Sequence, residues 1–179
     1  EFDPQFYLAY FQLGVLQKKQ GQSKASISSL NKVLDIKPDH DKTWFTLGSV
    51  HETDGNNDLA IEHYSKAIDI NPGYSKAYGS LGKLYTDKEE FNKAEDILKT
   101  VVQIDPEYAN GFMRLGLLYI EQENYKEAAK NLKISTDLDD KDHNKYFNLA
   151  SAYNQLEKWD EAAKAAQSCI DLKKKFGGG

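Results

Sequence analysis

Residues 44–72 read WFTLGSVHETDGNNDLAIEHYSKAIDINP, and this stretch decides the fold. It begins with an aromatic residue followed by Leu47 and Gly48, and this spacing places all three on one helical face. Gly55 comes next, and glycine can adopt the left-handed turn that links two helices. Pro72 closes the stretch, because proline disfavours a helical conformation in the residue before it. The stretch therefore predicts two amphipathic helices joined in a hairpin.

The same pattern recurs every 34 residues along the chain. Three prolines keep this spacing: Pro38, Pro72 and Pro106. A leucine followed by a small residue keeps it too, at Leu13, Leu47, Leu81, Leu115 and Leu149. So does a large aromatic residue, at Tyr10, Trp44, Tyr78, Phe112 and Tyr146. Registers that agree over the whole chain indicate five copies of one helical hairpin.

The 34-residue pattern resembles the tetratricopeptide repeat, which follows W-x2-L-G-x2-Y, then A-x3-F, then P. The resemblance implies an all-α fold, a right-handed superhelical solenoid of antiparallel helix pairs. It places the repeats at 7–40, 41–74, 75–108, 109–142 and 143–176, between an N-terminal extension at 1–6 and a tail at 177–179. The sequence departs from the pattern at His51, a usual tyrosine position, and at Asp140 and Lys174, which replace the closing proline.

The third repeat predicts helices near residues 75–88 and 91–104. The glycine beside most of the leucines indicates that two helix backbones approach closely. Gly21 and Gly55 suit the left-handed turn inside the first two hairpins. The other three hairpins place a less favourable glutamate there: Glu89, Glu123 and Glu157. We infer that an aromatic residue two places later compensates by packing at the hairpin: Phe91, Tyr125 or Trp159.

Composition limits the kinds of partner. The 179 residues carry a net charge of −5, and an acidic chain is a poor general binder of nucleic acid. The single cysteine, Cys169, excludes an internal disulfide and a cysteine-rich metal site. No apolar run approaches the roughly 20 residues of a membrane-spanning helix. We therefore expect a protein or peptide partner, with no nucleic acid, no membrane insertion and no cofactor.

No residue pattern points to catalysis. The four histidines lack metal-binding spacing, and His51 is interpreted as a core or groove residue. The sequence contains no nucleophile elbow and no phosphate-binding loop. The acidic run at residues 139–142 lacks the calcium-loop pattern and is interpreted as a solvated turn that has lost its proline. Since the repeat explains nearly every strong feature, the sequence predicts a protein that is not an enzyme.

The resemblance implies that the first helix of each repeat lines a concave groove. A larger apolar strip lies on these positions in the fourth repeat and a smaller one in the first. Arg114 is the only arginine, and its planar fork can hold a carboxylate through two parallel hydrogen bonds. Packing under neighbours is an equal alternative for the phenylalanines, and a solvent-facing role is an equal alternative for Arg114. The candidate groove residues are Phe11, Val15, Phe45, Met113, Arg114, Leu117, Ile120, Asn144, Phe147 and Asn148.

These observations favour a non-catalytic protein–protein interaction scaffold that binds a peptide or protein segment in the groove. The alternative is a substrate-recognition or regulatory arm of a larger enzyme, such as a glycosyltransferase. A third hypothesis is weak self-association through the uncovered ends of the array, because no further helix follows the last repeat. We expect a cytoplasmic location, and we expect the natural protein to continue past Gly179.

Overall fold

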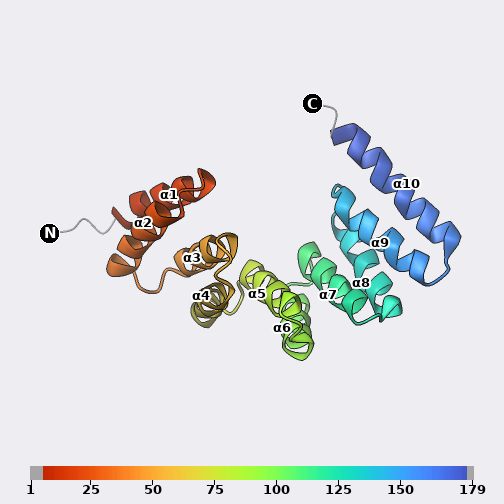
Figure 1. Cartoon of the computed structure of the whole chain (residues 1–179), viewed down its shortest axis with the longest axis horizontal. Coiled ribbons are helices and arrows are strands. Elements are labelled where there is room, and N and C mark those ends of the chain that lie inside the picture. The colour runs from red at the N-terminus through yellow and green to blue at the C-terminus, as the bar shows by residue number, and fades with distance from the viewer. Residues whose placement is uncertain (1–5, 177–179) are drawn as a thin grey trace. The chain divides into compact units, whose positions relative to one another are not determined.

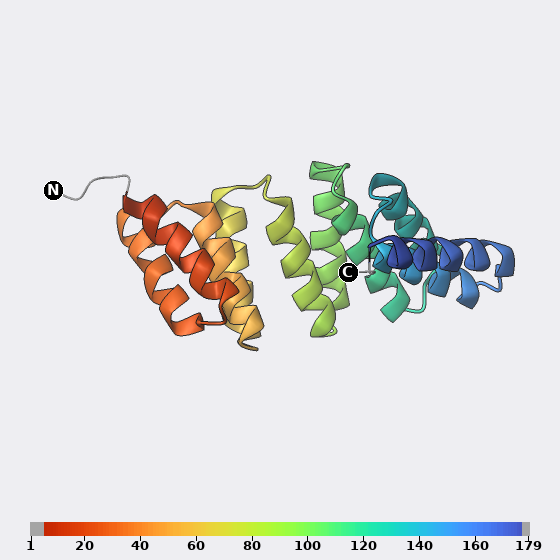
Figure 2. The same ribbon diagram turned by 90° about the horizontal axis from the view of Figure 1, so that it is seen from above.

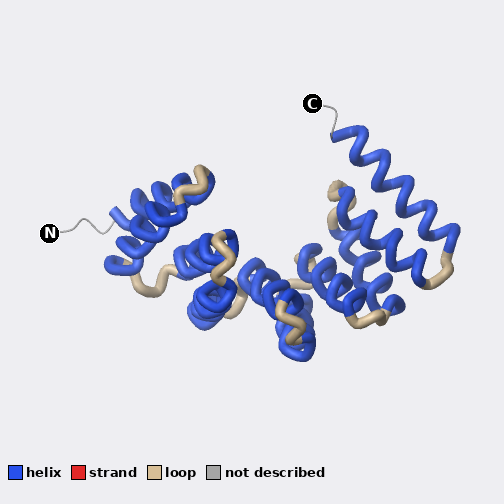
Figure 3. The backbone as a smooth tube through the Cα atoms, in the orientation of Figure 1, coloured by secondary structure: helices blue, strands red, loops and turns tan. Residues whose placement is uncertain are grey.

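The computed structural model describes residues 6–176, and every regular element within them is an α-helix (Figures 1 and 3). The helices follow one another in pairs: α1 (Phe6–Lys19), α2 (Ser23–Ile36), α3 (Asp41–Thr53), α4 (Asn57–Ile70), α5 (Ser75–Asp87), α6 (Phe91–Ile104), α7 (Ala109–Glu121), α8 (Tyr125–Leu138), α9 (His143–Gln155) and α10 (Trp159–Phe176). The ends of α2, α4 and α6 each lie just before a proline, as its backbone restriction requires. The predicted all-α fold of successive helix pairs is confirmed.

The chain forms two compact halves, an N-terminal half of residues 1–84 and a C-terminal half of residues 85–179. In the N-terminal half, α1 pairs with α2 and α3 pairs with α4, and α2 packs against α3. In the C-terminal half, α7 pairs with α8 and α9 pairs with α10, and α8 packs against α9. Figure 2 shows paired helices running side by side within each half. The second helix of one pair therefore packs against the first helix of the next.

The helix pairs α3–α4 and α7–α8 cross closely at the glycine that follows the leucine. A Cβ atom added at Gly48 would lie 2.7 Å from the side chain of Tyr64. One added at Gly116 would lie 2.6 Å from the side chain of Leu132. The facing helix also contributes an alanine without exposed surface: Ala60 or Ala128. The predicted role of the glycine, to let the two backbones approach, is confirmed at both crossings.

Gly116→Ala tests the crossing. The added methyl group would meet the fully buried Leu132, and such overpacking costs about 1–3 kcal/mol. The gain in helix propensity offsets only about 1 kcal/mol of this cost. We expect a lower free energy of unfolding in urea, and we expect the loss to vanish in a Leu132→Ala background, where the methyl group has room. An equal loss in both backgrounds would contradict the crossing as its cause.

The turn inside each hairpin places one residue in the left-handed conformation. Gly21 and Gly55 have φ angles of 72° and 77°, as predicted. The equivalent glutamates have φ angles of 58° or 59°: Glu89, Glu123 and Glu157. The expected compensation by aromatic packing is wrong for the last hairpin, because Trp159 is 61% exposed. Backbone strain therefore remains at Glu157.

Replacing this glutamate by glycine, Glu157→Gly, is expected to stabilise the protein. Removing the side chain relieves the left-handed conformation and stabilises the folded state by about 1–2 kcal/mol. Glycine is also more flexible in the unfolded chain, and this costs about 0.5–1 kcal/mol of that gain. Gly55→Ala is expected to destabilise by a similar net amount, with no steric contribution, since nothing lies within 4 Å of the added Cβ atom. Thermal unfolding should show Tm shifts of opposite sign, and shifts of the same sign would contradict the strain.

Side-chain hydrogen bonds replace proline in the turn between α8 and α9. The carboxylate of Asp142 accepts from the Asn144 backbone N–H at 2.9 Å and so caps α9. The ammonium group of Lys145, which is only 1% exposed, donates to the carboxylate of Asp139. This hydrogen bond lowers the pKa of Asp139. The sequence did not predict a buried lysine here, because the equivalent residues in earlier repeats are small: Thr43, Ala77 and Gly111.

Asp139→Ala would leave the Lys145 ammonium group buried without its carboxylate. Losing a hydrogen bond to a charged group costs about 1.5–3 kcal/mol, which we expect as a lower free energy of unfolding at neutral pH. Since the pKa of Asp139 is lower in the folded than in the unfolded chain, its contribution is complete above the unfolded-state pKa and disappears as the pH falls through the folded-state pKa. The gap between wild type and variant should therefore close in acid.

The matched control for this substitution is Asp140→Ala, at the exposed neighbouring residue. We expect this control to unfold like the wild type at every pH. A stability gap for Asp139→Ala that persisted in acid would contradict the hydrogen bond to Lys145 as its source.

Candidate functional site

In the N-terminal half, polar side chains on successive first helices bond to one another. Lys18 on α1 donates a hydrogen bond to Ser49 on α3. Lys83 on α5 pairs with Glu52 on α3 at 3.1 Å, and the Tyr64 hydroxyl donates to the same carboxylate at 2.7 Å. Burial, followed by this hydrogen bond, raises the pKa of Tyr64. The polar groups on this surface are therefore bonded to one another within the protein.

Two of the three predicted groove residues of this half, Phe11 and Phe45, pack against neighbouring side chains. Phe11 is half-buried against the apolar cluster that joins α2 to α3. Phe45 lies against the rings of Tyr64 and Tyr74, with ring centroids 5.3 Å and 5.0 Å away. Val15 is half-buried on α1. The alternative left open by the sequence, packing under neighbouring side chains, describes Phe11 and Phe45.

The C-terminal half presents a different surface at the corresponding helix positions. We define the α7 strip as four half-buried residues of α7: Met113, Arg114, Leu117 and Ile120. Leu115 and Leu118 of the same helix are buried, at 4% and 0% exposure, so they hold the opposite face of α7 in the core. The helical spacing therefore turns the apolar side chains of the strip away from that core.

Arg114 is the polar member of the α7 strip. Its Nε atom is buried, and no hydrogen-bond acceptor lies near it within residues 6–176. Its positive charge partly opposes the rise that burial causes in the pKa of Tyr108. Helix α9 contacts α7 and carries the half-buried Asn148 and the exposed Asn144. Two neighbouring helices thus combine apolar carbon, one guanidinium group and two amides.

Phe147 is the exception among the predicted residues of α9. It is 64% exposed and lines a hollow of about 620 Å³ between α9 and α10. The other lining residues are Ala150, Ser151, Asn154, Trp159, Ala162, Ala163, Ala166, Cys169 and Ile170. The predicted site did not include the α10 residues.

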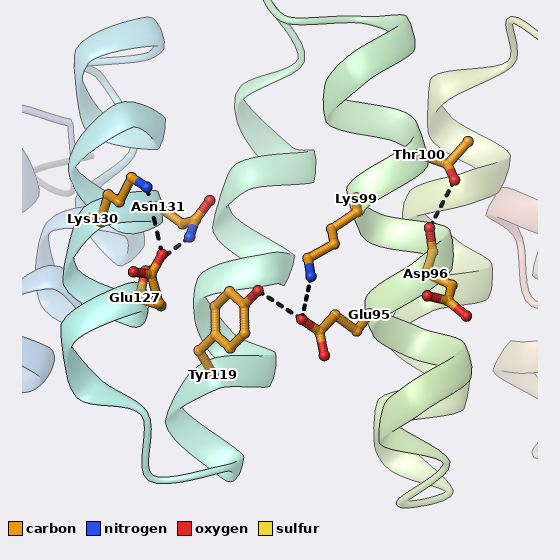
Figure 4. Close-up of polar contacts among 8 residues, drawn as sticks. All are labelled: Glu95, Asp96, Lys99, Thr100, Tyr119, Glu127, Lys130 and Asn131. Atoms are coloured by element: carbon orange, nitrogen blue, oxygen red, sulfur yellow. Dashed lines mark hydrogen bonds and ion pairs between the residues drawn. The ribbon is translucent and has the colours of Figure 1, made fainter.

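Figure 4 shows how α6, α7 and α8 use their polar side chains. The Tyr119 hydroxyl donates to Glu95 at 2.9 Å and so links α7 to α6. The Lys99 ammonium group lies 2.6 Å from the same carboxylate, and its hydrogen bond lowers the pKa of Glu95. These three groups form a structural link between two repeats, and their pairing leaves them poorly placed to act as acid or base.

His51 is confirmed as a packed residue. Its ring meets that of His63 edge to face, with centroids 5.1 Å apart, and burial lowers the pKa of His63. Residues 6–176 contain no group of three or more histidine, cysteine or acidic side chains that could hold a metal ion. Nor does any helix in that range combine the length and the apolar character needed to cross a membrane.

Three models of the tetratricopeptide repeat match the chain, at residues 7–40, 53–118 and 113–173. Together they cover all but short segments, and the first coincides with the first predicted repeat. No curated protein sequence matches the chain.

Solved structures resemble the chain over nearly its full length. A MamA structure is 23% identical, with a TM-score of 0.78 over 93% of this chain and 98% of that chain. A structure described as the functional characterization of Pseudomonas aeruginosa pilF is 19% identical, with a TM-score of 0.81 over 97% and 93%. A thermophilic TPR protein of Thermus thermophilus is 22% identical, with a TM-score of 0.73 over 96% and 97%.

At these identities the solved structures support the fold alone. The family models add the sequence pattern, which the structure explains through the helix crossings and the left-handed turns. The chain belongs to the tetratricopeptide repeat family.

Proposed function

We propose that this protein is a non-catalytic scaffold that binds a segment of a partner protein across α7 and α9. The repeats support a role in protein–protein interaction. The observation that carries the location is the α7 strip, where half-buried apolar side chains share one helix with a guanidinium group whose Nε makes no hydrogen bond. In the N-terminal half, by contrast, the corresponding polar groups already bond to each other.

The α7 strip specifies the chemistry of the segment. Leu117 and Ile120 offer aliphatic surface to one or two apolar side chains of the partner. Arg114 offers donors to a carboxylate or a backbone carbonyl near those side chains. Asn148 and Asn144 offer amides that can pair with the backbone of an extended segment. A short stretch with apolar residues beside an acidic group satisfies all three.

Leu117→Asp tests this site against an array of immobilised peptides, with affinities then measured by calorimetry. Burying one leucine side chain contributes about 1.5–3 kcal/mol, so we expect bound peptides to lose at least about tenfold in affinity. The matched control is Leu138→Asp, because Leu138 is an exposed leucine (40%) in the same half of the chain, on α8. Circular dichroism establishes that both variants remain folded.

Arg114→Lys adds a second readout, because lysine keeps the charge and loses the planar fork. We expect it to weaken acidic apolar peptides and to leave purely apolar ones unchanged. Peptides bound equally by the wild type, Leu117→Asp and Arg114→Lys would place the binding surface elsewhere and refute the proposal.

A further inference from the structure

Exposed large apolar side chains gather on the first and the last repeat. Helix α1 carries four that are between 43% and 53% exposed: Phe6, Leu8, Leu13 and Leu16. The last pair carries three that are between 46% and 64% exposed: Phe147, Trp159 and Ile170. Helices α4, α6 and α8 carry single examples: Leu59, Ile104 and Leu138. Both ends of the array therefore present apolar surface to solvent.

The repeat shows what would normally cover α1. Leu13 is 43% exposed, whereas its counterparts in the later repeats are between 1% and 4% exposed: Leu47, Leu81, Leu115 and Leu149. Leu16 is 53% exposed, whereas its counterparts are at most 1% exposed: Val50, Leu84, Leu118 and Ala152. Leu13 and Leu16 thus occupy positions that are buried in every later repeat.

One joint between repeats is resolved in atomic detail in the N-terminal half. There, Leu30 of α2 forms a buried cluster with Leu47 and Val50 of α3. Partly buried residues complete the cluster: Phe11, Ile27, Leu34 and Trp44. The joint is therefore made by the second helix of one repeat, the first helix of the next repeat and one phenylalanine from the first helix of the earlier repeat.

The two ends together carry every position of this joint. On α1, the counterparts of the α3 residues are Tyr10, Leu13 and Leu16. On the last pair, the counterparts of the α2 residues and of Phe11 are Ala163, Ala166, Ile170 and Phe147. These four last residues all line the hollow of about 620 Å³. The hollow has room because alanines stand where α2 has Ile27 and Leu30.

We propose that α1 of one copy docks in the α9–α10 hollow of a second copy, joining copies head to tail. Leu13 and Leu16 enter the hollow against Ala163, Ala166 and Ile170, as Leu47 and Val50 meet α2 within the chain. Because the two surfaces differ, the contact is heterologous and can be propagated from copy to copy. This contact does not involve the α7 strip, so it can be tested independently of the proposed partner site.

Charge sets the conditions for the contact. The exposed flank of α1 ends in Lys19, and α10 ends in Lys173, Lys174 and Lys175. Acidic groups on α10 lie at the other end of the helix, at Asp160 and Glu161. The start of α2 lies beside the end of α3, where Ser23 donates a hydrogen bond to Asp54, so these two helices run antiparallel. In the same arrangement Lys19 lies near Asp160 and Glu161, and salt screens the attraction between these charges. Association should therefore weaken moderately as salt is added.

Sedimentation equilibrium of the whole chain tests the proposal, over about 10 μM to 1 mM protein, the range of weak apolar contacts. We expect the wild type to associate with rising concentration. Leu13→Asp removes the α1 surface, and Ile170→Asp removes the α10 surface, so each variant alone should be monomeric. An equimolar mixture keeps one intact surface of each kind and should give a dimer and nothing larger. Leu117→Asp should associate like the wild type.

Two results would overturn the proposal. A wild type that stays monomeric at the highest concentration, at low salt as well as at high salt, would show that the two surfaces do not bind each other. Association by Leu13→Asp alone would show that the hollow meets another hollow in a symmetric dimer instead. Leu138→Asp is the control for adding an acidic group to an exposed leucine, and circular dichroism of all variants establishes that they are folded.

Discussion

The close crossing of two helices at a glycine is the constraint on which the rest of the structure depends. At Gly116 the backbone lies so near Leu132 that a single methyl group would have to displace that side chain. Where glycine stands at the crossing, this proximity sets how deeply the neighbouring leucine is buried, and so which residues remain to contact the next repeat. The joint between repeats and the exposed positions of each first helix follow from that geometry.

The two halves of the chain differ in the side chains that their first helices present at the candidate groove. Within the N-terminal half, Glu52 accepts a hydrogen bond from Tyr64 and pairs with Lys83. These polar groups on the candidate groove therefore already bond to one another. In the C-terminal half the corresponding positions carry Leu117 and Ile120, which no polar network covers. The same fold thus offers a matched polar surface in one half and an unmatched apolar one in the other.

The fold was largely predictable because periodicity reports on packing directly. The leucine–glycine spacing, the prolines and the left-handed glycines all have counterparts in the structure, and the helix bounds of the third repeat agree with those expected. The sequence did not predict the structure where one repeat carries a residue unlike its counterparts in the other repeats. The burial of Lys145 depends on Asp139, six residues away along the chain and on the other side of a turn, and no periodic pattern signals that pairing.

The site was predictable only in part for the same reason. Helical spacing placed Met113, Leu117 and Ile120 on one face, but it could not show that the ring of Phe45 lies against two tyrosines. Nor could it show that Trp159 is largely exposed, because its exposure depends on which helix follows rather than on its own neighbours in sequence.

Met113 allows the most direct test of partner binding across α7 and α9, because it is the only methionine in the chain. Labelling its methyl group with ¹³C gives a single NMR signal from the N-terminal end of the α7 strip. The account predicts that this signal shifts in proportion to the fraction of protein bound when a partner peptide is added. A peptide that binds by calorimetry and leaves the Met113 signal unchanged would contradict it.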